Sequence, residues 1–124
     1  MSRTTDANPQ LYHSNDTFEW DGQVWIKRNS ATRPPAMTNF GMVYDSYRGC
    51  TVLFGGHRYT PPDFINGTQV ITNDLWEWDG VNWTKITPPS PPPARTQPVM
   101  CFDTVRRETL MTGGNPLNPE PGDY

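Results

Sequence analysis

The side chains best suited to bind a ligand are concentrated in three stretches of the chain, at 29–36, 57–72 and 87–96. They combine three arginines with a histidine, an aspartate and two aromatic rings: Arg33, His57, Arg58, Tyr59, Asp63, Phe64 and Arg95. Arginine forms paired hydrogen bonds with carboxylates, and aromatic rings stack on flat or apolar surfaces. These residue types predict binding of a polar ligand, either a carbohydrate or part of another protein.

Some of these side chains also have a structural interpretation. His57 follows two glycines, where a histidine can brace a loop, and Arg95 lies in a link where it can hold strands together. The two histidines define no Ser/His/Asp set, and no nucleophile elbow is present. No Cys/His spacing is typical of a metal site. We therefore predict no catalytic residues, no metal and no cofactor, and favour a non-catalytic protein.

Composition narrows the class of protein further. The chain has 124 residues, including 14 prolines and 10 glycines, and a formal net charge of −3. Aromatic residues reach 12%, although all hydrophobic residues together are only 34%. Disordered segments are poor in aromatic residues, so a turn-rich all-β fold fits better. Cys50 and Cys101 leave a disulfide open without requiring one.

Charge and hydropathy also exclude classes of partner. The acidic balance provides no basic surface for nucleic acid. No apolar run is long enough to cross a bilayer, and no basic amphipathic face suits a membrane surface. The first ten residues lack the apolar segment of a signal peptide. The sequence thus predicts neither a nucleic-acid nor a membrane partner, and it leaves the cellular compartment open.

One stretch of the sequence occurs twice. Residues 15–25 return as residues 73–83, and the offset of 58 then holds without a gap. Comparing 15–57 with 73–115 gives 18 identities in 43 positions, where ordinary residue usage would give about two or three. A repeat of this length indicates units that bury their apolar faces against one another.

Hydrophobic alternation predicts the elements that must position the polar side chains. It indicates strands at 15–20, 23–28, 38–45 and 50–54 in the first copy, and at 73–78, 82–86, 97–103 and 108–112 in the second. The Asp-Gly pairs at 21–22 and 79–80 predict type I′ hairpin turns. Residues 57–72 are predicted to form a long loop. Alternation also puts Phe40, Met42 and Tyr44 on one face of their strand.

The repeated residues have predicted structural roles. The tryptophans should pack between sheets, and the double glycines should end strands where the backbone turns or approaches a neighbour. These residues are Trp20, Trp25, Gly55, Gly56, Trp78, Trp83, Gly113 and Gly114.

Together these features resemble the kelch repeat of β-propellers. The resemblance rests on the double glycines, the aromatic strand Trp76-Glu77-Trp78, the later Trp83 and the Pro-Pro-Ala-Arg link at 92–95. It covers about residues 15–115. The chain departs from the pattern at Met37, which replaces the arginine found at 95, at Pro98, and at Thr112, which replaces the aromatic residue found at 54.

The resemblance implies an all-β fold of four-stranded blades. It assigns one complete blade to 37–86, an outer half-blade and link to 15–36, and a link with an inner half-blade to 87–114. Loops are expected at 1–14 and 115–124.

The function expected from the resemblance is a non-catalytic scaffold that binds protein or carbohydrate through the long loops on one rim. The alternative is a fragment of a larger secreted kelch-propeller carbohydrate-active enzyme or oxidase, whose catalytic residues lie outside this chain. Because two blades' worth of strands cannot close a ring, a head-to-tail homotrimer completing a six-bladed ring is also predicted.

Overall fold

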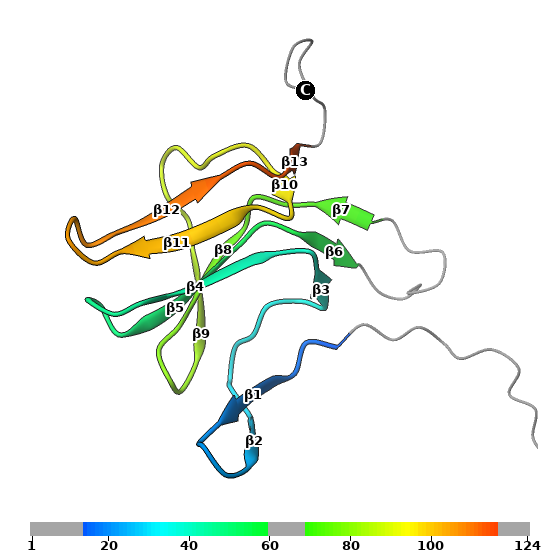
Figure 1. The fold of residues 1–124 in the computed structure, drawn as a ribbon. Helices are drawn as coiled ribbons and strands as arrows, with labels where there is room; N and C mark the ends of the chain where they lie inside the picture. Colours follow the sequence, from blue (N-terminus) through cyan, green and yellow to red (C-terminus); the bar gives the residue numbers. More distant parts are fainter. Residues whose placement is uncertain (1–13, 60–68, 117–124) are drawn as a thin grey trace, which may run out of the picture.

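The computed structural model describes residues 14–59 and 69–116, and throughout these residues the fold is all-β (Figure 1). A central antiparallel sheet contains four strands in the order β4 (Gly41–Asp45), β5 (Cys50–Phe54), β8 (Leu75–Trp78) and β9 (Trp83–Ile86). The described residues form no helix, hence none long and apolar enough to cross a membrane. None of the sheets that they form closes on itself.

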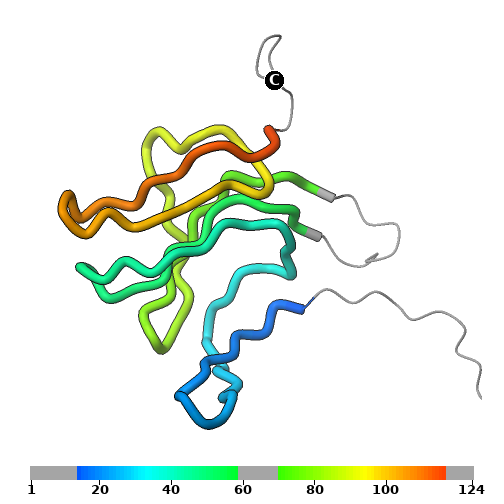
Figure 2. Tube along the Cα trace, in the orientation of Figure 1, coloured from blue at the N-terminus to red at the C-terminus, as the bar shows by residue number. Residues whose placement is uncertain are grey.

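Two antiparallel hairpins flank the central sheet. The first consists of β1 (Thr17–Trp20) and β2 (Trp25–Arg28), and the second of β11 (Val99–Asp103) and β12 (Glu108–Thr112). In the tube view, the chain passes from the first hairpin through the central sheet to the second, which lies on the other side (Figure 2). The central sheet is therefore the middle layer of the molecule.

The smaller strands gather at one end of the central sheet. β3 (Met37–Thr38), β6 (His57–Tyr59) and β7 (Gln69–Ile71) form one small antiparallel sheet. β10 (Arg95–Thr96) pairs with β13 (Asn115–Pro116) in another. At this end β4 and β8 begin and β5 and β9 end, so we call it the long-loop rim. The tight turns between β4 and β5 and between β8 and β9 lie at the opposite end.

The sequence repeat is also a structural repeat. Adding 58 to the bounds of β1 to β5 gives the bounds of β8, β9, β10, β11 and β12 in turn. The side-chain amide of Asn15 donates to the Pro34 carbonyl at 3.3 Å, and that of Asn73 donates to the Pro92 carbonyl at the same distance. Both copies thus fold into the same local structure, as their shared residues require.

The two Asp-Gly hairpin loops differ from the predicted type I′ turns. Each spans four residues rather than two, and only its glycine has a positive φ, 100° at Gly22 and 97° at Gly80. The aspartate instead organises the loop, because Asp21 Oδ1 accepts backbone N–H groups from Gln23 and Val24 at 2.7 and 2.8 Å. Asp79 does the same in the second copy. An aspartate commonly stabilises a turn in this way.

The main hydrophobic core lies on the face of the central sheet that meets the first hairpin. It contains Met37, Leu53, Trp76, Trp78 and Trp83, each at most 7% exposed. The register explains the grouping, because Leu53 pairs with Trp76 across β5 and β8, and Trp78 pairs with Trp83 across β8 and β9. Side chains opposite one another in neighbouring strands project to the same face.

Polar bonds attach the first hairpin to this core. The indole N–H of Trp78 donates to Glu19 Oε1, and that of Trp83 donates to Thr17 Oγ1, both at 2.8 Å. Buried indoles usually place their N–H on such an acceptor.

The opposite face of the central sheet meets the second hairpin. A Cβ atom at Gly41 would lie 2.5 Å from the Met100 sulfur and 2.8 Å from a Pro98 carbon, so β4 and β11 approach closely there. Val52 and Phe54 are each 4% exposed beneath this hairpin. Both faces of the central sheet are consequently covered, which accounts for the nearly continuous apolar sequence of β5.

The double glycine after β5 allows close backbone approach. Gly55 and Gly56 have φ values of 74° and 93°. A Cβ at Gly55 would lie 2.5 Å from the Arg95 carbonyl oxygen, and one at Gly56 would lie 2.7 Å from the Thr38 carbonyl oxygen. Any other residue would clash as well as carry an unfavourable φ. The pair therefore brings β10 of the second repeat against the end of β5.

Three expectations from the sequence are corrected. Trp20 and Trp25 were expected between sheets but are 53% and 67% exposed, because no described residues cover the outer face of their hairpin. Part of the predicted 57–72 loop forms β6 and β7, since β6 also pairs with β3. Residues 115–116, predicted as loop, form β13 in the same relation to β10 that β6 has to β3.

Replacing Trp78 with alanine tests the core. Trp78→Ala removes a ring that is 7% exposed, and we expect it to lower the free energy of unfolding by about 3–5 kcal/mol. The matched control is Trp20→Ala, at the equivalent repeat position, where the ring is 53% exposed and the expected loss for the isolated chain is below about 1 kcal/mol. Chemical denaturation followed by circular dichroism measures both. Equal losses would show that Trp78 is not the residue that joins the two layers.

Candidate functional site

The structure places four of the predicted binding side chains, and each has a different environment. Arg33 Nη1 lies 3.6 Å from Asp16 Oδ1, a long ion pair at the surface. His57 Nδ1 is 3.3 Å from the Asn39 side-chain amide. The Arg58 Nε atom is buried and has no hydrogen-bond partner in the described part of the chain.

Arg95 is held by the backbone. Its guanidinium donates to the Gly113 carbonyl at 3.0 Å and to the Pro93 carbonyl at 3.2 Å. These bonds link β10 to the glycine pair that follows β12. Arg95 therefore braces this part of the fold, which agrees with its structural interpretation.

The remaining predicted residues are placed less fully. Tyr59 ends β6, but its side chain, together with the whole of Asp63 and Phe64, lies outside the described residues. His57 and Arg58 are neighbours on β6, paired with β3. The long-loop rim therefore holds His57 and Arg58 on a regular strand, with Arg33 in the link that leads into β3.

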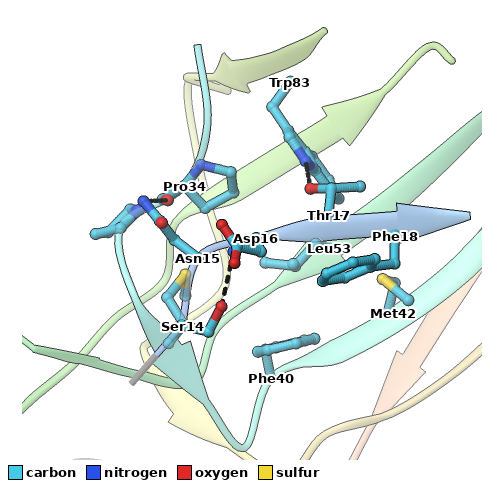
Figure 3. Close-up of a pocket in the computed structure, with 12 residues that line it drawn as sticks. Ser14, Asn15, Asp16, Thr17, Phe18, Pro34, Phe40, Met42, Leu53 and Trp83 are labelled. Carbon is cyan, nitrogen blue, oxygen red and sulfur yellow. Dashed lines mark hydrogen bonds between the residues drawn. The ribbon is translucent and has the colours of Figure 1, made fainter. Parts of the chain in front are cut away.

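A cavity of about 200 Å³ opens beside this rim, between the first hairpin and the central sheet (Figure 3). Its apolar wall contains Phe18 from β1, Phe40 and Met42 from the start of β4, and Leu53 from β5. In the close-up the rings of Phe18 and Phe40 and the Met42 side chain gather on one side of this space. Concave sites of this kind usually combine an apolar lining with a few oriented polar groups.

The polar wall is formed by the segment that enters β1. The backbone N–H of Asp16 donates a hydrogen bond to Ser14 Oγ at 3.0 Å. Its carboxylate lies 3.6 Å from both Arg33 and Lys27, and its side chain is 34% exposed. These distances are long for ion pairs. The Asp16 carboxylate thus stands beside the cavity in contact with solvent and with two cations.

The residues that line this cavity are suited to binding a ligand. Thr17 Oγ1 already accepts the Trp83 indole N–H, and the Asn15 amide is bonded to the Pro34 carbonyl (Figure 3). No described cluster of three or more His, Cys, Asp or Glu side chains could hold a metal ion. Both cysteines are free thiols, and Cys50 is buried. The arrangement offers an apolar surface with a carboxylate at its edge.

Sequence reasoning missed this cavity. It did predict Phe40 and Met42 on one strand face, but it assigned the binding role to charged and aromatic residues of the loops. Phe18 corresponds to Trp76 in the second repeat, and Trp76 is buried in the core. The signal that could have found the site is the change from tryptophan to phenylalanine at this repeat position, which leaves less ring to fill the space.

A second cavity, of about 460 Å³, lies on the other face of the central sheet beside β12. An ion-pair network forms part of its wall. Arg48 donates to Asp45 Oδ2 at 2.7 Å and binds both oxygens of Glu77 at 2.8 and 3.0 Å. Burial raises the pKa of Asp45, but hydrogen bonds from the Arg48 backbone and guanidinium outweigh it and lower the pKa overall. The pKa of the Cys50 thiol is raised, chiefly by burial and then by the Glu77 charge.

No protein-family model, curated protein or solved structure matched this chain in the three comparisons. We therefore infer function from the geometry of the two repeats and their cavities.

Acid should weaken the attachment of the first hairpin through Glu19. Hydrogen bonds from the Trp78 indole and from Arg28 lower the pKa of Glu19 below its ordinary value of 4.5. A carboxylate with a lowered pKa stabilises the fold above its unfolded pKa, and this stability is lost as pH falls through the folded value. We expect Glu19→Gln to have a smaller fall in thermal midpoint than the unmodified protein between about pH 5 and pH 3.

The control for this pH dependence is Glu108→Gln, because the Glu108 side chain is 63% exposed and, in the described part of the chain, its ion pair is with Arg106 at 3.3 Å. Differential scanning calorimetry over a pH series would compare the three proteins. Indistinguishable pH profiles for Glu19→Gln and the unmodified protein would contradict the role assigned to the Glu19 carboxylate.

Proposed function

We propose that the chain is a segment of a kelch-type β-propeller that acts as a non-catalytic binding scaffold. The observation that carries the proposal is the four-stranded antiparallel sheet with a neighbouring hairpin packed on each face, built from repeats offset by 58 residues. Radial stacking of such sheets is the organising feature of propellers. The double glycine after β5 and the tryptophans of β8 and β9 support the kelch type.

In this interpretation the central sheet is one blade within 37–86. The hairpin β1–β2 is the outer half of the preceding blade, and β11–β12 is the inner half of the following one. The attachment of the two hairpins to opposite faces of the central sheet supports this order. Each face of a blade would then be covered by the corresponding part of its neighbour.

The ligand we propose is a carbohydrate bound in the cavity between the first hairpin and the central sheet. A sugar ring has an apolar face and a hydroxyl-bearing edge. Phe18, Phe40 and Met42 supply the apolar surface, and the half-exposed Asp16 carboxylate supplies an acceptor for hydroxyl groups. Charge-assisted hydrogen bonds of this kind are stronger than those between neutral groups. Arg33, His57 and Arg58 lie along the same rim, where they would extend the site toward an acidic substituent.

A glycan-binding screen with matched variants tests this function. We expect binding of at least one neutral or acidic oligosaccharide, and we expect Phe40→Ala and Asp16→Ala each to weaken it by about tenfold or more. The control is Tyr47→Ala, which removes a 62% exposed ring at the opposite end of the sheet. Isothermal titration calorimetry would measure each affinity, and circular dichroism would confirm that each variant is folded.

A separate variant tests whether residues 57–72 contribute to binding. Replacing Arg58, Tyr59 and Phe64 together should reduce affinity for acidic more than for neutral oligosaccharides. Binding that is lost in this triple variant but unchanged in Phe40→Ala and Asp16→Ala would move the site to the loop. Absence of any oligosaccharide ligand, with binding of peptides instead, would replace carbohydrate by protein as the partner.

A further inference from the structure

A tilted pair of tryptophan rings occurs in both repeats, but its surroundings differ. The ring centroids are 5.4 Å apart in Trp20–Trp25 and 5.5 Å apart in Trp78–Trp83, with interplanar angles of 49° and 46°. Trp78 and Trp83 are 7% and 6% exposed, whereas Trp20 and Trp25 are 53% and 67% exposed. The first hairpin therefore presents, to solvent, the same preformed aromatic surface that the second repeat buries.

The surface that receives such a pair is also present twice. Within the chain, Glu19 accepts the Trp78 indole N–H on Oε1 and an Arg28 N–H on Oε2, at 2.8 and 2.9 Å. Its repeat counterpart is Glu77, which Arg48 holds through both oxygens. A carboxylate oxygen can accept more than one hydrogen bond. Glu77 is thus also held by an arginine, although Arg48 comes from the turn between β4 and β5 and not from the position of Arg28, and a Glu77 oxygen can still accept an indole N–H.

Space for a hairpin exists beside Glu77. The cavity of about 460 Å³ is bordered by Leu75 and Glu77 of β8, Val52 of β5, and Thr109 and Met111 of β12. Three of these residues, Leu75, Glu77 and Met111, correspond in the first repeat to Thr17, Glu19 and Leu53. Inside the chain, Thr17 and Glu19 contact the hairpin that carries Trp78 and Trp83. The cavity consequently occupies the position where a third tryptophan hairpin would continue the series.

Unpaired strand edges would supply backbone hydrogen bonds to a docked hairpin. Inside the chain β5 pairs with both β4 and β8, whereas its counterpart β12 pairs only with β11 among the described strands. Likewise β1 pairs only with β2, although its counterpart β8 pairs with both β5 and β9. An open edge of one strand can accept another strand by antiparallel pairing. The edges of β12 and β1 are the two that the repeat geometry would join.

We propose that the hairpin β1–β2 of a second copy of this chain docks along β12 and into the cavity beside Glu77. The β5–β8 register, which pairs Thr51 with Trp78 and Leu53 with Trp76, then places Thr109 opposite Trp20 and Met111 opposite Phe18 of the second copy. Trp20 donates its indole N–H to Glu77. The contact is head to tail, and three copies joined in this way complete the six-sheet ring expected from the repeat.

The glycine pair after β12 provides a further point of contact. Gly56 N–H donates to the Arg95 carbonyl at 2.9 Å, and a Cβ at Gly55 would meet the same oxygen. The equivalent space above Gly113 holds no atom of the described residues within 4 Å. In the docked pair the Met37 backbone of the second copy, which corresponds to Arg95, occupies this space. The same carbonyl then accepts the Gly114 N–H.

One substitution assigns the specific polar contact to Trp20. Thr17, which accepts the Trp83 indole, corresponds to Leu75, which has no hydroxyl. Trp25 of the second copy therefore contributes apolar contact alone, and Trp20 supplies the indole hydrogen bond. Loss of the Trp20 ring removes both a buried aromatic surface and the partner of Glu77.

Sedimentation equilibrium and light scattering on the complete chain test the docking. We expect the 14.1 kDa chain to form a trimer whose dissociation constant rises at least tenfold in Trp20→Ala. Leu110→Lys alters the β12 side of the contact. Leu110 is 58% exposed, whereas its counterpart Val52 is 4% exposed, so docking would bury the introduced charge. The control is Val81→Lys, at a residue 68% exposed in the turn after β8, which should assemble normally.

Mixing the two defective variants separates head-to-tail docking from symmetric association. Trp20→Ala retains an intact β12 surface, and Leu110→Lys retains an intact first hairpin. Together they should form a 1:1 heterodimer that neither forms alone. A monomer at all concentrations, an assembly insensitive to both substitutions, or failure of the folded variants to complement each other would overturn the proposal. By the repeat relation, docking buries Leu110 of one copy against Met42 and Leu53 of the next, which line the proposed carbohydrate cavity, so assembly and oligosaccharide binding compete for that surface. Titration of oligosaccharide against monomeric Leu110→Lys, in which this cavity stays open, tests the carbohydrate proposal independently of assembly.

Discussion

The hydrogen bond from the Trp78 indole to Glu19 joins the two repeats and fixes how they stack. The indole ring lies in the core of one repeat, while its N–H reaches the hairpin of the other. Apolar contact alone would allow the hairpin to slide across the sheet. Leaving a buried donor without its acceptor destabilises the fold, so the bond favours one alignment of the hairpin on the sheet. Trp83 and Thr17 add a second fixed point.

This constraint explains why most of the remaining structure follows the 58-residue offset. Once β1–β2 lies on the tryptophan face, the link through Pro34 must run along the long-loop rim to reach β3. The glycine pair after β5 then lets the Arg95 backbone cross close above it. The second hairpin reaches the opposite face through the same link in the second repeat. The cavity between the first hairpin and the central sheet is a consequence of this stacking, since Phe18 fills the space beside Met42 less completely than a tryptophan would.

Sequence reasoning could predict the all-β class, the extent of the repeat and the strands of the central sheet. These depend on alternation and on residues repeated at a fixed offset, and both are local signals. It could not distinguish Trp20 from Trp78, because the two sit in nearly identical sequences and differ only in what covers them. It assigned His57 to a loop because three strand residues before a proline pair carry too little alternation. The cavity was inaccessible to sequence reasoning because its walls come from segments that meet only after stacking.

The two repeats differ in the polarity of the residues on their corresponding strands β5 and β12. Phe54 is buried in β5, and the corresponding residue of β12 is the more polar Thr112. Cys50 is likewise buried, and its counterpart is the charged Glu108, which pairs with Arg106. Charged and polar residues on an edge strand oppose indiscriminate pairing. They are compatible with the proposed selective contact, because Glu77, held by Arg48, would match an indole N–H at one register. The same β12 surface could therefore be hydrated in the free chain and specific for a docked tryptophan hairpin.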